Sequence, residues 1–132
     1  MKKLTVVVMS LFYLLACSAI LYAQEVDYKA GYEKQMKLNA DTMAVINTVV
    51  QWLKDHKYES YPFAKQTVED ALDQLNYGEE AKKRAESFAK QGNWQQAYGW
   101  ENQYYQYLIK VATQGLMAKK MVEDVEASAG AK

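Results

Sequence analysis

Apolar side chains recur at alternating steps of four and three residues along most of this chain. That spacing is typical of a helix that buries one stripe of side chains, as in coiled coils. The first such segment covers about residues 26–57. Its stripe includes one polar residue, Asn39, and otherwise consists of Tyr32, Met36, Met43, Ile46, Val50 and Leu53. The pattern predicts one long amphipathic helix.

Two more segments show the same spacing, at about residues 62–91 and 94–126. In the second segment the stripe consists of Ala64, Val68, Ala71, Leu75, Gly78, Ala81, Ala85 and Phe88. In the third segment Glu101 is the polar exception, and the other members are Ala97, Tyr104, Leu108, Val111, Gly115, Ala118, Val122 and Val125. We expect two further helices, and we expect the small and polar residues after 126 to fray.

Capping and helix-breaking residues mark the turns between these segments. Ser60 suits the N-cap of the second helix and Pro62 its first turn. Gly92 suits a helix C-cap, and Asn93 suits the N-cap of the third helix. Gly78 stands inside the second segment, where glycine costs about 1 kcal/mol relative to alanine. We favour one helix that is kinked or loosened at Gly78 over two short helices.

Three helices joined by short turns run antiparallel to their neighbours in sequence. The sequence therefore predicts an all-α, up-down-up three-helix bundle with coiled-coil-like packing. The number of helices becomes four if the middle one breaks at Gly78. An N-terminal signal helix precedes the bundle. The single proline, Pro62, argues against a loop-rich or all-β fold.

The start of the chain has the pattern of a secretory signal peptide. Lys2 and Lys3 precede an uncharged run from residue 4 to residue 23, and acidic residues follow almost at once. Small or tolerated residues near the end of the run favour cleavage between Ala23 and Gln24. We expect residues 1–23 to be a signal peptide, and residues 24–132 to be one helical domain that is periplasmic or secreted.

Two alternative interpretations of this segment place the protein at a membrane. Residues 14–17 read Leu-Leu-Ala-Cys and resemble the lipobox of bacterial lipoproteins, which implies a lipidated Cys17 and a membrane-anchored lipoprotein. The uncharged run is also long enough to span about 30 Å of hydrocarbon as a helix, if it is not cleaved. We expect membrane attachment only in these two cases.

Charge and cysteine content bear on the class of function. Without Lys2 and Lys3 the chain has 14 basic and 16 acidic residues, a net charge of −2, which makes no case for binding nucleic acid. Cys17 is the only cysteine, so the domain after residue 23 has neither disulfides nor thiol chemistry. A small exported domain without disulfides is stabilised by its core or by partners.

The densest candidate site is the stretch from residue 94 to residue 107, where six aromatic residues stand among amides and one carboxylate. One interpretation is a platform on which a glycan or another small ligand stacks. The other, which we favour, is packing in the core or against a protein partner, because the apolar arc spans about 200° and a helix with two neighbours needs that width. The candidate contact residues are Trp94, Tyr98, Trp100, Tyr105 and Tyr107.

The sequence around the second turn resembles the turn of a tetratricopeptide hairpin, at the positions of Phe88, Gly92, Trp94 and Ala97. The resemblance covers about 13 residues of one hairpin, and no second copy follows at the family's period of about 34 residues. It implies a helical hairpin at this turn, and we carry over no peptide binding from it.

No residue pattern predicts a metal, a cofactor or a catalytic centre. His56 is the only histidine, whereas a di-iron bundle needs two Glu-x-x-His motifs. We expect His56 to be a solvated residue at a helix end. The sequence has no recognisable Ser/His/Asp set and no glycine-rich phosphate loop.

The sequence therefore favours a non-enzymatic helical protein of the bacterial periplasm or outer surface. It would act by protein contact, as a structural, adaptor or chaperone-like element. Wide apolar arcs and eleven tyrosines favour self-association or a protein partner. The alternative is a small-ligand or glycan binder that uses the aromatic region from Trp94 to Tyr107.

Overall fold

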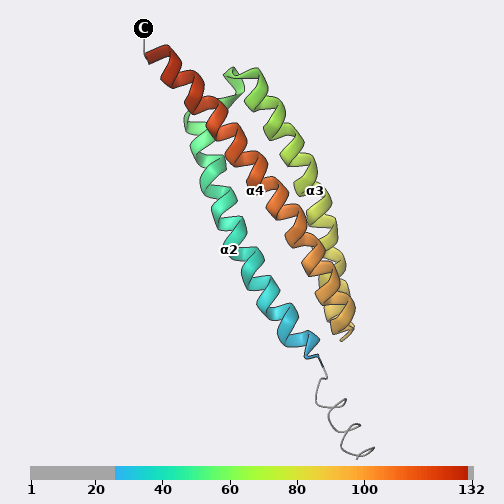
Figure 1. Cartoon of the computed structure of the whole chain (residues 1–132). Coiled ribbons are helices and arrows are strands. Elements are labelled where there is room, and N and C mark those ends of the chain that lie inside the picture. The colour runs from blue at the N-terminus through green and yellow to red at the C-terminus, as the bar shows by residue number, and fades with distance from the viewer. Residues whose placement is uncertain (1–25, 131–132) are drawn as a thin grey trace, which may run out of the picture.

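The computed structural model describes residues 26–130, and every regular element in that range is helical. The elements, in chain order, are α2 (Tyr28–Asp55), the short 3-10 turn η1 (Tyr58–Ser60), α3 (Pro62–Lys90) and α4 (Trp94–Gly130). The chain runs along α2, returns along α3 and runs forward again along α4 (Figure 1). The predicted all-helical fold of three packed helices is confirmed.

The predicted signal segment lies outside the described residues. This holds for residues 1–23, for the cleavage position between Ala23 and Gln24, and for Cys17.

The turn between α2 and α3 differs in one detail from the prediction. Asp27 caps the start of α2, since its side chain accepts a hydrogen bond of 3.0 Å from the Ala30 amide. Pro62 occupies the first turn of α3, as predicted, but the N-cap is Tyr61 rather than Ser60. Ser60 ends the 3-10 turn η1, whose entry requires Lys57 to adopt a left-handed backbone with φ of 51°. Ser60, the predicted N-cap of α3, therefore belongs to the 3-10 turn that precedes the helix.

The turn between α3 and α4 follows the prediction except that the C-cap of α3 is Gln91, and Gly92 is the residue after it. Gly92 has a φ of 73°, the left-handed conformation that ends many helices. The Asn93 side chain accepts a hydrogen bond of 3.3 Å from the Gln96 amide at the start of α4. Phe88, Trp94 and Ala97 belong to one apolar cluster beside this turn. The residues that resemble a tetratricopeptide turn therefore form a helical hairpin here.

Helix α3 is continuous through Gly78, so the alternative with four helices is wrong. Gly78 is buried and faces α4. A Cβ atom at this position would lie 3.0 Å from the Tyr107 Cβ and 3.2 Å from the Tyr104 Cδ2. The missing side chain lets two tyrosines approach the α3 backbone, and their packing offsets the low helix propensity of glycine.

Helix α4 is longer than predicted, because it reaches Gly130 instead of ending near residue 126. The Lys120–Asp124 ion pair, at 2.9 Å, spans one turn near its end. The Ser128 hydroxyl donates a bond of 2.7 Å to the Asp124 carbonyl. The red end of α4 extends past the turn between α2 and α3 (Figure 1), so its last turns are exposed.

Most of the buried residues lie on the predicted stripes, but Val49 is buried although the predicted stripe includes Val50 in its place, and Val50 is half-buried. The buried residues are Tyr32, Asn39, Ile46, Val49 and Leu53 of α2, Ala64, Val68, Ala71, Gly78, Ala81 and Ala85 of α3, and Ala97, Glu101, Tyr104, Leu108, Val111, Ala118 and Val122 of α4. Two predicted core positions are wrong: Met36 is 44% exposed and Val125 is 52% exposed. Met36 lies on an open side of α2, and Val125 lies near the projecting end of α4.

Helix α4 holds the bundle together. It contacts both α2 and α3 along its length, whereas no Cα atom of α2 lies within 8 Å of a Cα atom of α3. Cα atoms lie about 2.3 Å from a helix axis, so α2 and α3 are further apart than the usual axial distance of about 8–10 Å for packed helices. The bundle is therefore open on the side where α2 faces α3.

Candidate functional site

The five candidate aromatic residues of α4 are divided between its two neighbours. Trp94 and Tyr98 lie on the α2 side. The Trp94 ring is 5.9 Å from that of Tyr32, and the Lys29 ammonium lies 5.4 Å from the Trp94 ring centre. The Tyr98 ring is 6.3 Å from that of Tyr28. These two aromatic residues pack the start of α4 against the start of α2.

Trp100 and Tyr107 lie on the α3 side. The Arg84 guanidinium stands 4.6 Å above the Trp100 ring, in cation–π geometry. The Tyr107 ring stacks on that of Tyr77, with centroids 6.2 Å apart, and the Lys110 ammonium lies 5.2 Å from its centre. Both α4 side chains are half-buried.

A surface depression of about 340 Å³ lies between side chains of α3 and α4 at this point. It is lined by Tyr77, Glu80, Ala81, Arg84, Trp100, Gln103 and Tyr107. Tyr105 is half-buried and is not part of this lining. The depression thus brings together Trp100 and Tyr107, whereas Trp94, Tyr98 and Trp100 pack against the apolar cluster of Tyr32, Ala85 and Ala97. The five predicted residues therefore do not form one platform.

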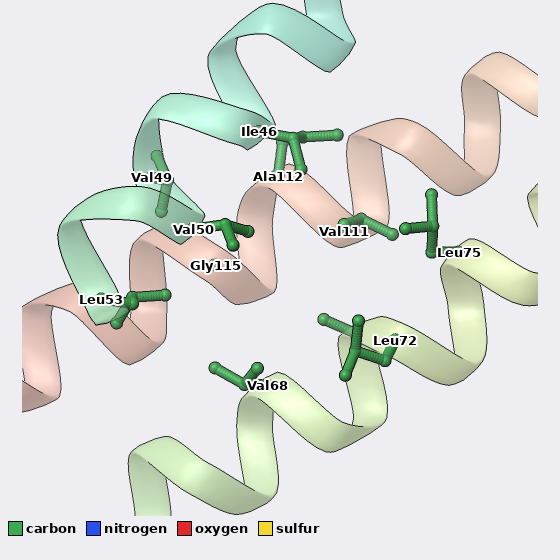
Figure 2. Close-up of a pocket in the computed structure, with 11 residues that line it drawn as sticks. Ile46, Val49, Val50, Leu53, Val68, Leu72, Leu75, Val111, Ala112 and Gly115 are labelled. Atoms are coloured by element: carbon green, nitrogen blue, oxygen red, sulfur yellow. The ribbon is translucent and has the colours of Figure 1, made fainter. Parts of the chain in front are cut away.

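The open side between α2 and α3 was not apparent from the sequence. Toward the turn that joins these helices, aliphatic side chains of α2 and α3 face each other over one side of α4 (Figure 2). We call this part the aliphatic groove. It is lined by Ile46, Val49, Val50 and Leu53 of α2, Val68, Ala71, Leu72 and Leu75 of α3, and Val111, Ala112 and Gly115 of α4.

The aliphatic groove is narrow, most of its lining residues are buried, and no polar side chain is part of its lining. Its enclosed volume is about 40 Å³, far below the roughly 300–1,000 Å³ of a typical small-molecule site. Leu72 stands at its rim and is 50% exposed. The groove therefore suits contact with another apolar surface better than it suits a small ligand.

The other half of the open side, toward the start of α2, has polar side chains among apolar ones. We call it the polar groove, a cleft of about 480 Å³. Its lining consists of Met36, Asn39, Ala40, Met43, Ala44 and Asn47 of α2, Glu79 and Lys82 of α3, and Glu101 and Tyr104 of α4.

Asn39 and Glu101, the polar exceptions in two stripes, meet at the base of the polar groove. The Asn39 amide nitrogen donates to the Glu101 carboxylate at 2.8 Å and to the Glu101 carbonyl at 3.0 Å. The Gln35 amide donates to the Asn39 side-chain oxygen at 3.2 Å. Asn39 and Glu101 are both almost fully buried. The amide of Asn39 is therefore satisfied, as buried polar groups require.

Burial raises the pKa values of two groups that line the polar groove, the Glu101 carboxyl and the Tyr104 hydroxyl. Loss of solvent raises the pKa of the Glu101 carboxyl above its ordinary value, although the bond from Asn39 and the charge of Lys82 act in the opposite direction. The Tyr104 hydroxyl donates to the Glu79 carboxylate at 3.1 Å. Burial, together with the negative charge of Glu79, raises the pKa of the Tyr104 hydroxyl. Both groups are thus hydrogen-bonded to side chains of neighbouring helices.

His56 is the C-cap of α2, and it is half-buried rather than solvated as predicted, since its ring stacks on Trp52 at 3.7 Å. Within residues 26–130, no three His, Cys, Asp or Glu side chains are placed to hold a metal ion. No helix in that range has the length and apolar composition needed to cross a membrane.

No family model, curated protein or solved structure matches this chain.

Proposed function

We propose that this protein is a non-enzymatic helical module of the bacterial cell envelope, and that it acts by protein contact through the aliphatic groove. The proposed occupant is an amphipathic helix with an aliphatic stripe. One observation supports this above the others: α2 and α3 both pack on α4, yet they leave aliphatic side chains facing each other with no helix between them. The envelope location rests on the signal pattern of the first 23 residues.

A helix laid along the groove would give α2 and α3 the second neighbour that each lacks. The arrangement would then be that of a four-helix bundle, in which every helix has two adjacent partners. Val50 and Leu75 are half-buried at the groove and Leu72 is half-exposed. Their heptad-like positions would allow coiled-coil-like packing against the added helix. Burial of each aliphatic side chain contributes in proportion to the apolar area removed from water.

Site-specific crosslinking in cells that make the full chain tests this proposal. A photoreactive residue at position 72 should give a discrete adduct to a helical segment with an aliphatic stripe. The matched control is position 116, because Leu116 is 52% exposed on α4 and lies outside the groove lining. Equal labelling from both positions, or no adduct from position 72, would contradict the proposed surface.

A second candidate function is the binding of a glycan or small ligand in the depression between α3 and α4. The observation in its favour is that Trp100 and Tyr107 stand there beside Gln103 and Arg84, which combine aromatic faces with hydrogen-bonding groups. Titration of the parent with a glycan panel, read by tryptophan fluorescence, tests it. Retention that Trp100→Ala abolishes and Trp94→Ala preserves would favour this function over protein contact.

A further inference from the structure

Charged residues of opposite sign flank Leu72 on the groove edge of α3. Lys65 precedes Leu72 by seven residues and Glu79 follows it by seven. Seven residues are nearly two helical turns, so all three side chains lie along one edge, about 10 Å apart. Leu72 lines the aliphatic groove and Glu79 lines the polar groove. The edge is thus basic at one end, aliphatic in the middle and acidic at the other end.

The charged groups at the two ends are accessible to another molecule. The Lys65 side chain is 53% exposed, and its ammonium lies 3.8 Å from Glu69 in the next turn, a loose surface pair. Glu79 is half-buried, and one of its oxygens accepts the Tyr104 hydroxyl. Between them, Val68, Leu72 and Leu75 supply the aliphatic part of the edge.

We propose that the occupant of the aliphatic groove is a second copy of this chain, placed antiparallel across a twofold axis that passes near Leu72. The proposal rests on the proposed function, because it names the helix that enters the groove. In an antiparallel pair centred on residue 72, Lys65 faces Glu79 of the partner subunit. Twofold symmetry repeats every such contact, so two oppositely charged pairs flank a central pair of Leu72 side chains.

The order of charges selects this arrangement over a parallel one. A parallel pair of α3 helices in register would place Lys65 beside Lys65 of the partner subunit, and Glu79 beside Glu79 of the partner subunit. Like charges at those positions repel, whereas the antiparallel pairing makes both contacts attractive. The aliphatic centre supplies the buried apolar area, and the charged ends determine direction and register.

Two leucine substitutions test whether the groove forms the dimer. Sedimentation velocity and native mass spectrometry of the full chain, as its own cells process it, should show a concentration-dependent dimer. Leu72→Asp should weaken dimerisation by roughly 100-fold, because two carboxylates would meet at the axis. Leu116→Asp has the same chemistry at a similarly exposed position of α4 and should leave the dimer intact. If Leu116→Asp dissociates the dimer and Leu72→Asp does not, the proposal is wrong.

Charge reversal tests the direction of pairing. Lys65→Glu should weaken the dimer by about three- to tenfold, because it would face Glu79 of the partner subunit. Adding Glu79→Lys to that variant should restore most of the lost affinity. Glu79→Lys also removes the acceptor of the Tyr104 hydroxyl, so structural damage alone would weaken the double variant further. No recovery in the double variant would overturn the antiparallel register.

The crosslink at position 72 separates this proposal from the proposed function. A parent chain that remains monomeric at all concentrations, yet crosslinks at position 72 to a helix of another protein, would overturn the second copy and retain the contact surface. A monomer without any adduct at position 72 would overturn both. A dimer whose crosslink joins residue 72 to the same region of its partner would support both.

Discussion

The two halves of the open side between α2 and α3 are built differently. In the polar groove, hydrogen bonds cross between helices: Asn39 of α2 donates to Glu101 of α4, and Tyr104 of α4 donates to Glu79 of α3. In the aliphatic groove, no lining side chain has a polar atom. One half is thus tied together by directional bonds, and the other is held only by nonpolar contact.

This difference separates internal specificity from external contact. Buried hydrogen-bonded pairs accept few alternative geometries, so they fix which residues of two helices stand opposite each other. Aliphatic surface has no such preference, and it is stabilised by any neighbour of fitting shape that excludes water. We therefore expect changes in the polar half to affect folding, and changes at the rim of the aliphatic half to affect association.

The largest expected effect is in the polar half. Tyr104 is buried, and its ring lies against Gly78. Tyr104→Ala should lower the free energy of unfolding by about 3–5 kcal/mol. Leu72→Ala, at the half-exposed rim of the other half, should cost the dilute monomer only about 1 kcal/mol. Urea denaturation of both variants at low protein concentration measures this, and equal losses would contradict the comparison.

The sequence predicts the helices well because their signals are local. The apolar stripes, Pro62, Gly92 and Asn93 all act within a few residues of their own position. The polar members of two stripes, Asn39 and Glu101, are also visible in the sequence as exceptions. That they form a pair is not visible, because it depends on how α2 and α4 are aligned.

The open side was not predicted for a similar reason. Periodicity marks which face of a helix is apolar, but it does not say which neighbour covers that face or how closely. Small residues such as Gly78 and Ala81 let α3 approach α4. The depth of that contact, and the resulting gap between α3 and α2, depend on tertiary packing. The wrong core position of Met36 has the same origin, because the stripe assumes a covering helix, and none of the described helices covers Met36.

The second prediction concerns the buried pair itself. Asn39→Leu leaves the Glu101 carboxylate buried without its side-chain donor, which should cost about 3 kcal/mol at neutral pH. The double variant Asn39→Leu with Glu101→Leu should recover most of this loss, because neither polar group remains. A double-mutant cycle of unfolding free energies measures the coupling. Additive losses in the double variant would show that the two side chains do not depend on each other.

The third prediction concerns the close approach of α3 and α4. Gly78→Ala gains about 1 kcal/mol of helix propensity, but its methyl group meets Tyr107 and Tyr104 at the short distances given above, and such overpacking costs about 1–3 kcal/mol. We expect a net loss of about 1 kcal/mol. Gly99→Ala is the control, since nothing lies within 4 Å of its added Cβ, and it should stabilise the protein. Thermal melts that show gains at both positions would argue against the close contact.

The smallest effect expected is a pH dependence from Glu101. Burial raises the pKa of its carboxyl above the ordinary value of 4.5, so the folded protein binds a proton more readily than the unfolded chain does. Stability from this group is therefore highest at low pH and falls as the pH rises from 4.5 to the raised folded value. Lys82 opposes this shift and Glu86 adds to it, but burial dominates.

Glu101→Gln separates this titration from the hydrogen bond. Glutamine keeps an oxygen that accepts from Asn39, yet it does not ionise. Relative to the parent, the variant should therefore gain stability as the pH rises through that window, and the difference should become constant above it. Unfolding free energies from about pH 4 to about pH 8 measure the difference, with the exposed Glu123→Gln as a control for net charge. If the difference stays level across the window, or matches that of Glu123→Gln, the Glu101 carboxyl is not desolvated, and the polar groove is more open to water than its hydrogen bonds indicate.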